Sequence, residues 1–151
     1  MPLIPQMPAV ARESIAELSI PPVGPADWTP AAPVHKRRVA VVSTAGLSKR
    51  DDKPFSWLAR DFRAFSKTER DLMMTHVAVD YDRTGWQQDL NTILPLDRLE
   101  EMAAAGETGS VAREHYSFMG ASDPLDMKRA VAEVAERMRR DNVNTVFLIP
   151  V

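Results

Sequence analysis

The segment RRVAVVST (37–44) decides the fold of this chain. After its two arginines it is an apolar run rich in valine, which is typical of a strand covered on both faces. Three other segments are predicted as strands: LMMTHVAVD (72–80), SVAREHYSF (110–118) and NTVFLIP (144–150). The segment 45–55 between the first two strands is polar and is predicted as a loop.

Two helices are predicted between and after these strands. The first, 95–109, has Pro95 near its first turn and Gly106 at its end. The second, 122–143, can be capped by Ser122 or Asp123 and carries an apolar stripe of Met127, Val131, Val134 and Met138. Strands alternating with helices favour an α/β fold: a Rossmann-like parallel sheet of about four strands with flanking helices and right-handed crossovers.

The N-terminal region differs from the rest of the chain in amino-acid composition. Residues 1–35 hold eight of the twelve prolines, each of which removes a backbone donor and restricts the preceding residue. We predict a proline-rich extended arm over 1–35, with one helical turn near residues 12–18 and Trp28 pinning it to the body. Residues 36–151 form one Rossmann-like domain in this interpretation.

The composition excludes several classes of function. A net charge of −2 gives no basic field for nucleic acid or an anionic membrane. The apolar runs are far shorter than the ~20 residues of a spanning helix, and the N-terminus does not resemble a secretory signal. A cytoplasmic location is therefore predicted. The absence of cysteine excludes disulfides, thiolate metal sites and cysteine nucleophiles within these residues.

The predicted chemistry lies at one edge of the sheet. In a parallel sheet, ligands gather outside the carboxyl ends of the strands. Residues 44–46, 81–83 and 118–120 follow the first three predicted strands, and Val151 follows the fourth. The substrate-binding candidates at or near this edge are Thr44, Tyr81, Arg83, Gln88, Asn91, Ser117 and Met119.

Three residues are candidates for catalysis: His76, His115 and Asp82. A histidine can orient a substrate or transfer a proton near neutral pH. The alternative is that both histidines are simply hydrogen-bonded core or rim residues. A metal site with Asp80 is a weaker reading, because no tight ligand spacing such as HxH is present, and no metal is predicted.

The segment TGWQQDLNTILPLDR (84–98) is dense in side-chain amides. Gln88 and Asn91 can bind a substrate, or they can connect this loop to the helix that follows it. The sequence leaves both interpretations open.

Several of these blocks resemble one known family. RVAVVSTAGL, THVAVDYDRTGWQQDLNTILPLDRLEEMAAAGETGSVA, HYSFMGASDP and DNVNTVFLIPV together resemble the selenoprotein B family of glycine, sarcosine, betaine and D-proline reductases. They are most similar to short bacterial members that resemble the selenoprotein subunit of D-proline reductase. The likeness runs from about Arg38 to Val151.

The resemblance implies an oxidoreductase that reductively cleaves a small amine or amino acid. In the family, a selenocysteine or cysteine forms a covalent bond with the substrate fragment, and dithiols supply the electrons. That residue follows the strand corresponding to 144–150. A partner reductase subunit is possible in some family systems.

The sequence departs from the family pattern at this point, because it contains neither selenocysteine nor cysteine. We expect a UGA codon read as stop and a selenocysteine directly after Val151, so that residues 1–151 alone are inactive and no cofactor lies within them. The uncovered sheet edge is then expected to self-associate, as a homodimer or aggregate, through Val146 and Leu148. The alternative is a non-catalytic α/β domain that binds a small molecule.

Overall fold

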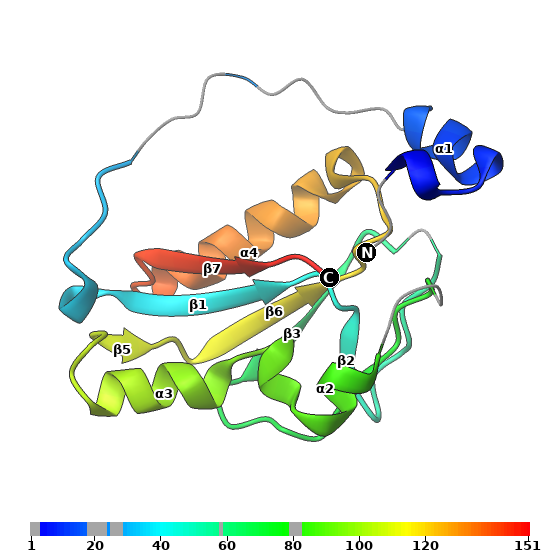
Figure 1. The fold of residues 1–151 in the computed structure, drawn as a ribbon. Coiled ribbons are helices and arrows are strands. Elements are labelled where there is room, and N and C mark those ends of the chain that lie inside the picture. Colours follow the sequence, from blue (N-terminus) through cyan, green and yellow to red (C-terminus); the bar gives the residue numbers. More distant parts are fainter. Residues whose placement is uncertain (1–3, 18–23, 25–28, 58, 79–82) are drawn as a thin grey trace.

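A computed structural model of the chain describes residues 4–17, 24, 29–57, 59–78 and 83–151. Strand β1 (Arg38–Ser43) lies inside the main sheet and pairs in parallel with three strands: β5 (Ser110–Val111), β6 (Glu114–Phe118) and β7 (Thr145–Ile149) (Figure 1). Strand β3 (Phe62–Ser66) pairs antiparallel with β6. The fold is therefore mixed α/β with a mostly parallel sheet, as predicted at this level.

Helices cover both faces of the sheet because β1 presents alternate side chains to each face. Val39 and Val41 pack in the cluster that contains Leu96 and Leu99 of α3 (Leu96–Ala104). Ala40 packs in the cluster on the other face with α4 (Lys128–Arg140), which buries Ala130, Val134 and Met138. The two predicted helices thus form the outer layers (Figure 1).

The prediction of a strand over 72–80 in the parallel sheet is wrong. Of residues 72–78, the part of this segment that the structure describes, only β4 (Leu72–Met74) is a strand, and it pairs antiparallel with β2 (Leu47–Lys49) in a separate two-stranded sheet. Residues 47–49 lie within the predicted polar loop, and the left-handed φ of +62° at Gly46 turns the chain into them. The edge position beside β6 is occupied by β3, which the sequence analysis missed.

The segment 110–118 is extended as predicted but is interrupted. Val39 of β1 pairs with Val111, and Val42 pairs with Tyr116. Three residue steps along β1 therefore correspond to five steps along the segment 110–118. Two extra residues therefore bulge out of the ladder between β5 and β6.

The helical elements of the N-terminal region only partly match the prediction. Helix α1 (Ala9–Ala16) begins before the single turn expected near residues 12–18. Trp28 lies outside the described residues, so its anchoring role and the division at residue 35 stay predictions. Within the described ranges no helix is long and apolar enough to cross a membrane. The remaining elements are η1 (Ile4–Gln6), η2 (Val34–Lys36), α2 (Thr84–Gln88), η3 (Leu90–Thr92) and η4 (Pro124–Met127).

Candidate functional site

The carboxyl ends of β1, β6 and β7 meet at one edge of the sheet, where the C-terminus also lies (Figure 1). We call residues 44–46, 118–120 and 149–151 the rim. The Thr44 amide donates to the Ile149 carbonyl (3.1 Å), and the Gly120 amide donates to the Thr44 carbonyl (3.1 Å). The expected convergence of these three strand ends is therefore present.

Thr44 fixes the backbone of Val151 at this rim. Its hydroxyl accepts a hydrogen bond from the Val151 amide (2.8 Å) and can donate to the Val151 carbonyl (3.3 Å). The predicted substrate-binding hydroxyl of Thr44 is thus engaged by the chain itself in this conformation.

His76 reaches the rim from the loop after β4. The side chain is 8% exposed, and its Nδ1 accepts a hydrogen bond from the Ala78 amide (3.1 Å). A neutral imidazole that accepts at Nδ1 carries its proton on Nε2. A Cβ added to Gly120 would lie 3.2 Å from that Nε2 and 2.8 Å from the Thr44 carbonyl oxygen. Glycine at position 120 therefore lets the imidazole approach the rim.

Arg83 positions the same loop. Its Nη2 donates to the carbonyl oxygens of His76 (3.2 Å) and Ala78. The guanidinium is therefore committed at least partly to backbone carbonyls rather than to the rim. Tyr81 and Asp82, predicted to contact and transform the substrate, lie outside the described residues.

His115 lies inside the sheet rather than at its edge. It is completely buried, and its Nδ1 accepts a hydrogen bond from the Val41 amide (3.0 Å). The bulge before β6 leaves this amide of β1 without a backbone acceptor, so the imidazole takes the place of that acceptor. Burial lowers the pKa of His115 to about 4. This placement favours the structural interpretation, and a catalytic role for His115 stays a prediction.

Two substrate-binding candidates are also interior residues. The Ser117 hydroxyl accepts from the Leu47 amide (2.9 Å), and Met119 packs with Phe55 and Ala59. Both side chains are 0% exposed, so the Ser117 hydroxyl cannot touch a substrate without a rearrangement, and Met119 contributes only to the wall of a hollow.

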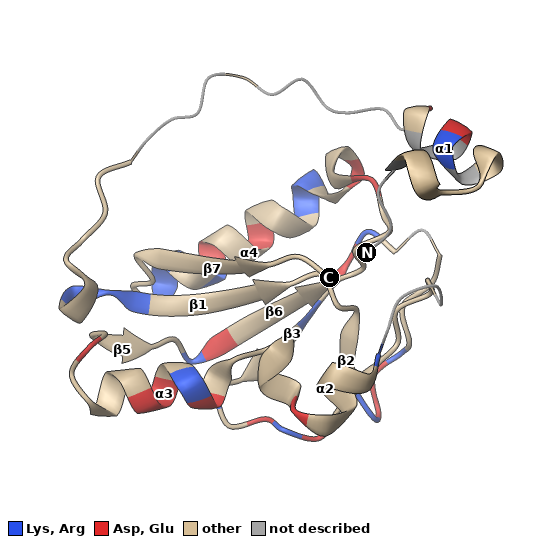
Figure 2. Ribbon diagram, in the orientation of Figure 1, with Lys and Arg blue, Asp and Glu red and all other residues tan. Residues whose placement is uncertain are grey.

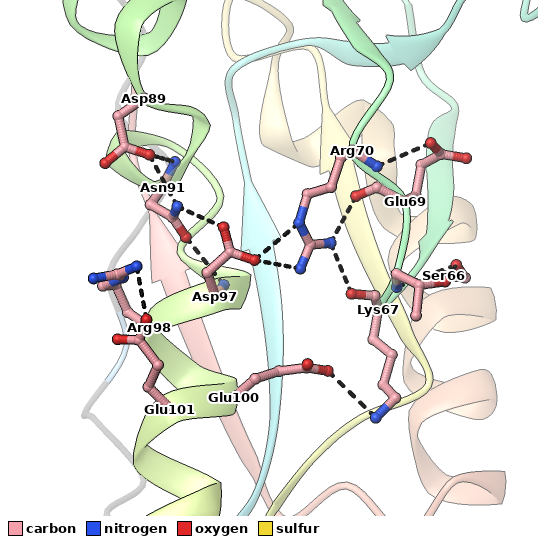
Figure 3. A network of polar contacts seen from close by, with 11 residues as sticks. Ser66, Lys67, Glu69, Arg70, Asp89, Asn91, Asp97, Arg98, Glu100 and Glu101 are labelled. Atoms are coloured by element: carbon pink, nitrogen blue, oxygen red, sulfur yellow. Dashed lines mark hydrogen bonds and ion pairs between the residues drawn. The ribbon is translucent and has the colours of Figure 1, made fainter.

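Asn91 connects η3 to α3, which is the second interpretation left open by the sequence. Its Nδ2 donates to carboxylates of Asp89 and Asp97 (2.9 Å each), and its Oδ1 accepts from the Asp97 amide (3.0 Å). Arg70 completes the network by pairing with Asp97 at 2.6 Å (Figure 3). The hydrogen bond from Asn91 lowers the pKa of Asp97. Gln88 is exposed at the end of α2.

A hollow of about 220 Å³ opens beside the rim on the α4 side of the sheet. It is lined by Thr44, Gly120 and Ser122 and by six apolar residues: Val42, Phe118, Met119, Pro124, Met127 and Val131. Two larger hollows, of about 430 and 370 Å³, share Glu133 and Arg137 and are lined by several ion-paired residues. We place the candidate site at the smaller hollow because, of these three hollows among the described residues, it is the one lined by rim residues.

The sequence analysis placed Gly120 at the strand ends but did not name it as a binding residue, and it missed Ser122 as a site residue. Ser122 was considered only as a helix cap, but Asp123 is the cap of η4, since its carboxylate accepts from the Leu125 amide (2.8 Å). Within the described residues no three metal-ligating side chains gather, and Asp80 and Asp82 lie outside that set.

A sequence profile of the glycine/sarcosine/betaine reductase selenoprotein B family matches residues 11–150. The chain belongs to this family. No curated protein and no solved structure matches it. In this member of the selenoprotein B family, the matched segment contains His76, Thr44, Gly120 and every other described rim residue except Val151. Membership implies a selenoprotein subunit of an amino-acid reductase complex, an oxidoreductase assembly with partner subunits.

Proposed function

We propose that this chain forms the substrate-holding sheet of a reductase subunit that cleaves a C–N bond in a small amine or amino acid. The observation that carries the proposal is the rim, where three strand ends and His76 converge next to a small hollow. D-Proline is the substrate that the sequence resemblance favours, followed by glycine, sarcosine and betaine.

The attacking group in this proposal is a selenocysteine or cysteine outside residues 1–151, because the sequence contains no cysteine. We place it directly after Val151. The Thr44 hydroxyl holds both polar backbone atoms of Val151, so a residue that follows would enter the rim. A helix beginning there would stabilise the chalcogenolate.

The proposed reaction is a two-electron reduction through a covalent intermediate. The chalcogenolate attacks the substrate carbon, the C–N bond breaks, and the amine leaves with its bonding pair and takes up a proton. The Nε2–H of His76 lies at the rim beside Gly120 and is our candidate hydrogen-bond donor to the leaving nitrogen, which takes its proton from solvent. A dithiol then supplies two electrons: the bond between carbon and selenium or sulfur breaks, the substrate carbon gains a hydrogen in its place, the chalcogenolate is regenerated, and the dithiol becomes a disulfide.

Residues 1–151 on their own are proposed to self-associate through β7. This strand pairs only with β1, and its other backbone edge is open among the described residues. Val146, Phe147 and Leu148 are 43%, 47% and 67% exposed, and β7 carries no charge that would discourage pairing (Figure 2). Sedimentation of the 1–151 chain and of Leu148→Lys tests this. A clean wild-type monomer at high concentration would contradict it.

The alternative function is a non-catalytic domain that binds a small molecule, and the zero cysteine count is the observation that favours it. A turnover assay separates the two functions. The natural protein, with whatever follows Val151 and with its partner subunits, is incubated with a dithiol and each of the four substrates.

We expect dithiol-dependent cleavage of one substrate by the natural protein and none by residues 1–151. His76→Gln should lower kcat more than it raises KM, because the proposed hydrogen bond from Nε2–H to the leaving nitrogen strengthens as the C–N bond breaks. Cleavage of no substrate, or turnover by residues 1–151 alone, would contradict the mechanism.

A further inference from the structure

The loop that carries His76 is anchored on both sides of the imidazole. Before it, the Thr75 amide and hydroxyl both donate to the Gly46 carbonyl (2.9 and 3.1 Å). A Cβ added to Gly46 would lie 3.0 Å from the Cα of His76, so the loop backbone packs closely against this turn. After it, Nη2 of Arg83 donates to the carbonyl oxygens of His76 (3.2 Å) and Ala78.

The contacts from Arg83 constrain the peptide group that fixes the imidazole. The Ala78 amide donates to His76 Nδ1 (3.1 Å), and the two carbonyls that Arg83 holds belong to the residues at the two ends of this short turn. The amide reaches Nδ1 only while the backbone between these residues keeps its conformation. A neutral imidazole that accepts at Nδ1 carries its hydrogen on Nε2, the nitrogen beside Gly120.

We propose that Arg83 is a positioning residue for His76. By holding the His76 and Ala78 carbonyls, it keeps the Ala78 amide on Nδ1 and so presents an Nε2–H donor at the rim. The sequence analysis expected the Arg83 guanidinium to bind the substrate directly. The geometry favours the indirect role, because both hydrogens of Nη2 are used by backbone carbonyls.

The use of this donor in the reaction rests on the proposed function, but its orientation by Arg83 does not. The two parts are therefore tested by two experiments, one without turnover and one with it. A reductase that fails and a loop that is not positioned by Arg83 then give different results.

The first experiment records the imidazole nitrogens of the ¹⁵N-labelled 1–151 chain at about pH 8, above the ordinary histidine pKa of about 6.5. His115 is the internal control for folding, because its Nδ1 accepts from the Val41 amide inside the sheet. His35 is exposed and is the reference for an imidazole that exchanges between tautomers. In wild type, His76 should be the Nε2–H tautomer, as His115 is, with an Ala78 amide that exchanges slowly.

Two substitutions of Arg83 measure its effect on the loop. Arg83→Met removes the donors but keeps a long side chain. The Ala78 amide should then exchange about three- to tenfold faster, the factor that one net hydrogen bond is worth, and the His76 signals should move toward those of His35. Arg83→Lys keeps a charged donor and should restore most of the protection.

The matched control is Arg98→Met. The Arg98 side chain is 61% exposed and pairs with Glu101 on α3, so its loss should leave the His76 signals unchanged. The His115 signals should stay in place in every variant. If displaced His115 signals show that Arg83→Met is unfolded, Arg83→Gln takes its place with the same expected outcomes.

The second experiment measures whether Arg83 acts through His76. Turnover is followed in the natural protein with its partner subunits. Arg83→Met should lower kcat about ten- to a hundredfold with little change in KM, because a displaced donor weakens a contact that strengthens in the transition state. In a His76→Gln background the same substitution should lower kcat no further, since the group that it positions is already gone.

Faster Ala78 exchange in Arg83→Met, recovery in Arg83→Lys and no added effect in the His76→Gln background support the proposal. Unchanged His76 and Ala78 signals in Arg83→Met overturn it, whatever the turnover result. A raised KM with unchanged kcat also overturns it and identifies Arg83 as a group that binds the substrate. If wild type cleaves no substrate, the proposed function fails, and the NMR result alone decides the role of Arg83.

Discussion

The buried imidazole of His115 couples the stability of the sheet to pH. Burial lowers the pKa of His115 from 6.5 to about 4, so the folded state keeps the imidazole neutral while the unfolded chain takes up a proton below pH 6.5. The stabilisation is complete above pH 6.5 and is lost as the pH falls toward 4. The neutral form is needed because Nδ1 must accept the Val41 amide.

The size of the effect follows from the two pKa values. A shift from 6.5 to about 4 lowers the free energy of unfolding by about 2 kcal/mol between pH 7 and pH 5, since each pKa unit corresponds to about 1.36 kcal/mol. Most carboxylates remain ionised at pH 5, so this interval isolates the histidine.

The perturbation is His115→Asn, which keeps an acceptor at about the position of Nδ1 but cannot be protonated in this range. Urea unfolding of both proteins at pH 7 and pH 5 gives the difference in pH dependence, and the other histidines cancel. Wild type should lose about 2 kcal/mol more than the variant, about 1 M in the urea midpoint. Equal losses in the two proteins would refute the assignment of His115 as a buried neutral acceptor.

Three further substitutions test the contacts around the sheet. Asp141→Asn should lower the free energy of unfolding in urea by about 2 kcal/mol, because the Asp141 carboxylate is 15% exposed and holds Arg38 at the start of β1. The control is Arg113→Gln: the Arg113 side chain is 82% exposed, so the urea midpoint should stay unchanged. Gly120→Ala should destabilise the rim and speed amide hydrogen exchange there, because the new Cβ would lie 2.8 Å from the Thr44 carbonyl oxygen. The control is Gly85→Ala in α2, where a Cβ meets no atom within 4 Å; it should raise the free energy of unfolding by about 0.5–1 kcal/mol. Asn91→Ala should lower the free energy of unfolding by about 1 kcal/mol, because it leaves the Asp97 amide at the start of α3 without its acceptor; thermal unfolding measures this.

The sequence predicted the elements whose signals are local. The valine run of β1 and the apolar stripe of α4 each identify a buried face without knowledge of the partner. These elements, with α3 and β7, account for the layers of the fold and for the rim at the strand ends.

The parts that the sequence did not predict depend on long-range pairing. Strand β4 pairs with residues 47–49, which look like a polar loop, and β3 is a short segment stabilised by its contact with β6. The close approach of His76 to Gly120 depends on a turn at Gly46 and has no local signature. Ser122 was interpreted as a helix cap because its contribution to a hollow appears only after the sheet and α4 are packed.

The most direct test of the proposed chalcogen at the rim is mass spectrometry of the protein from its natural source. Trypsin cleaves after Arg140, so the peptide that contains β7 begins at Asp141. The account predicts that this peptide continues past Val151 and carries the isotope pattern of selenium, or a cysteine, at the next position. A peptide that ends at Val151 with a free carboxylate, or one that continues without either residue nearby, would contradict it.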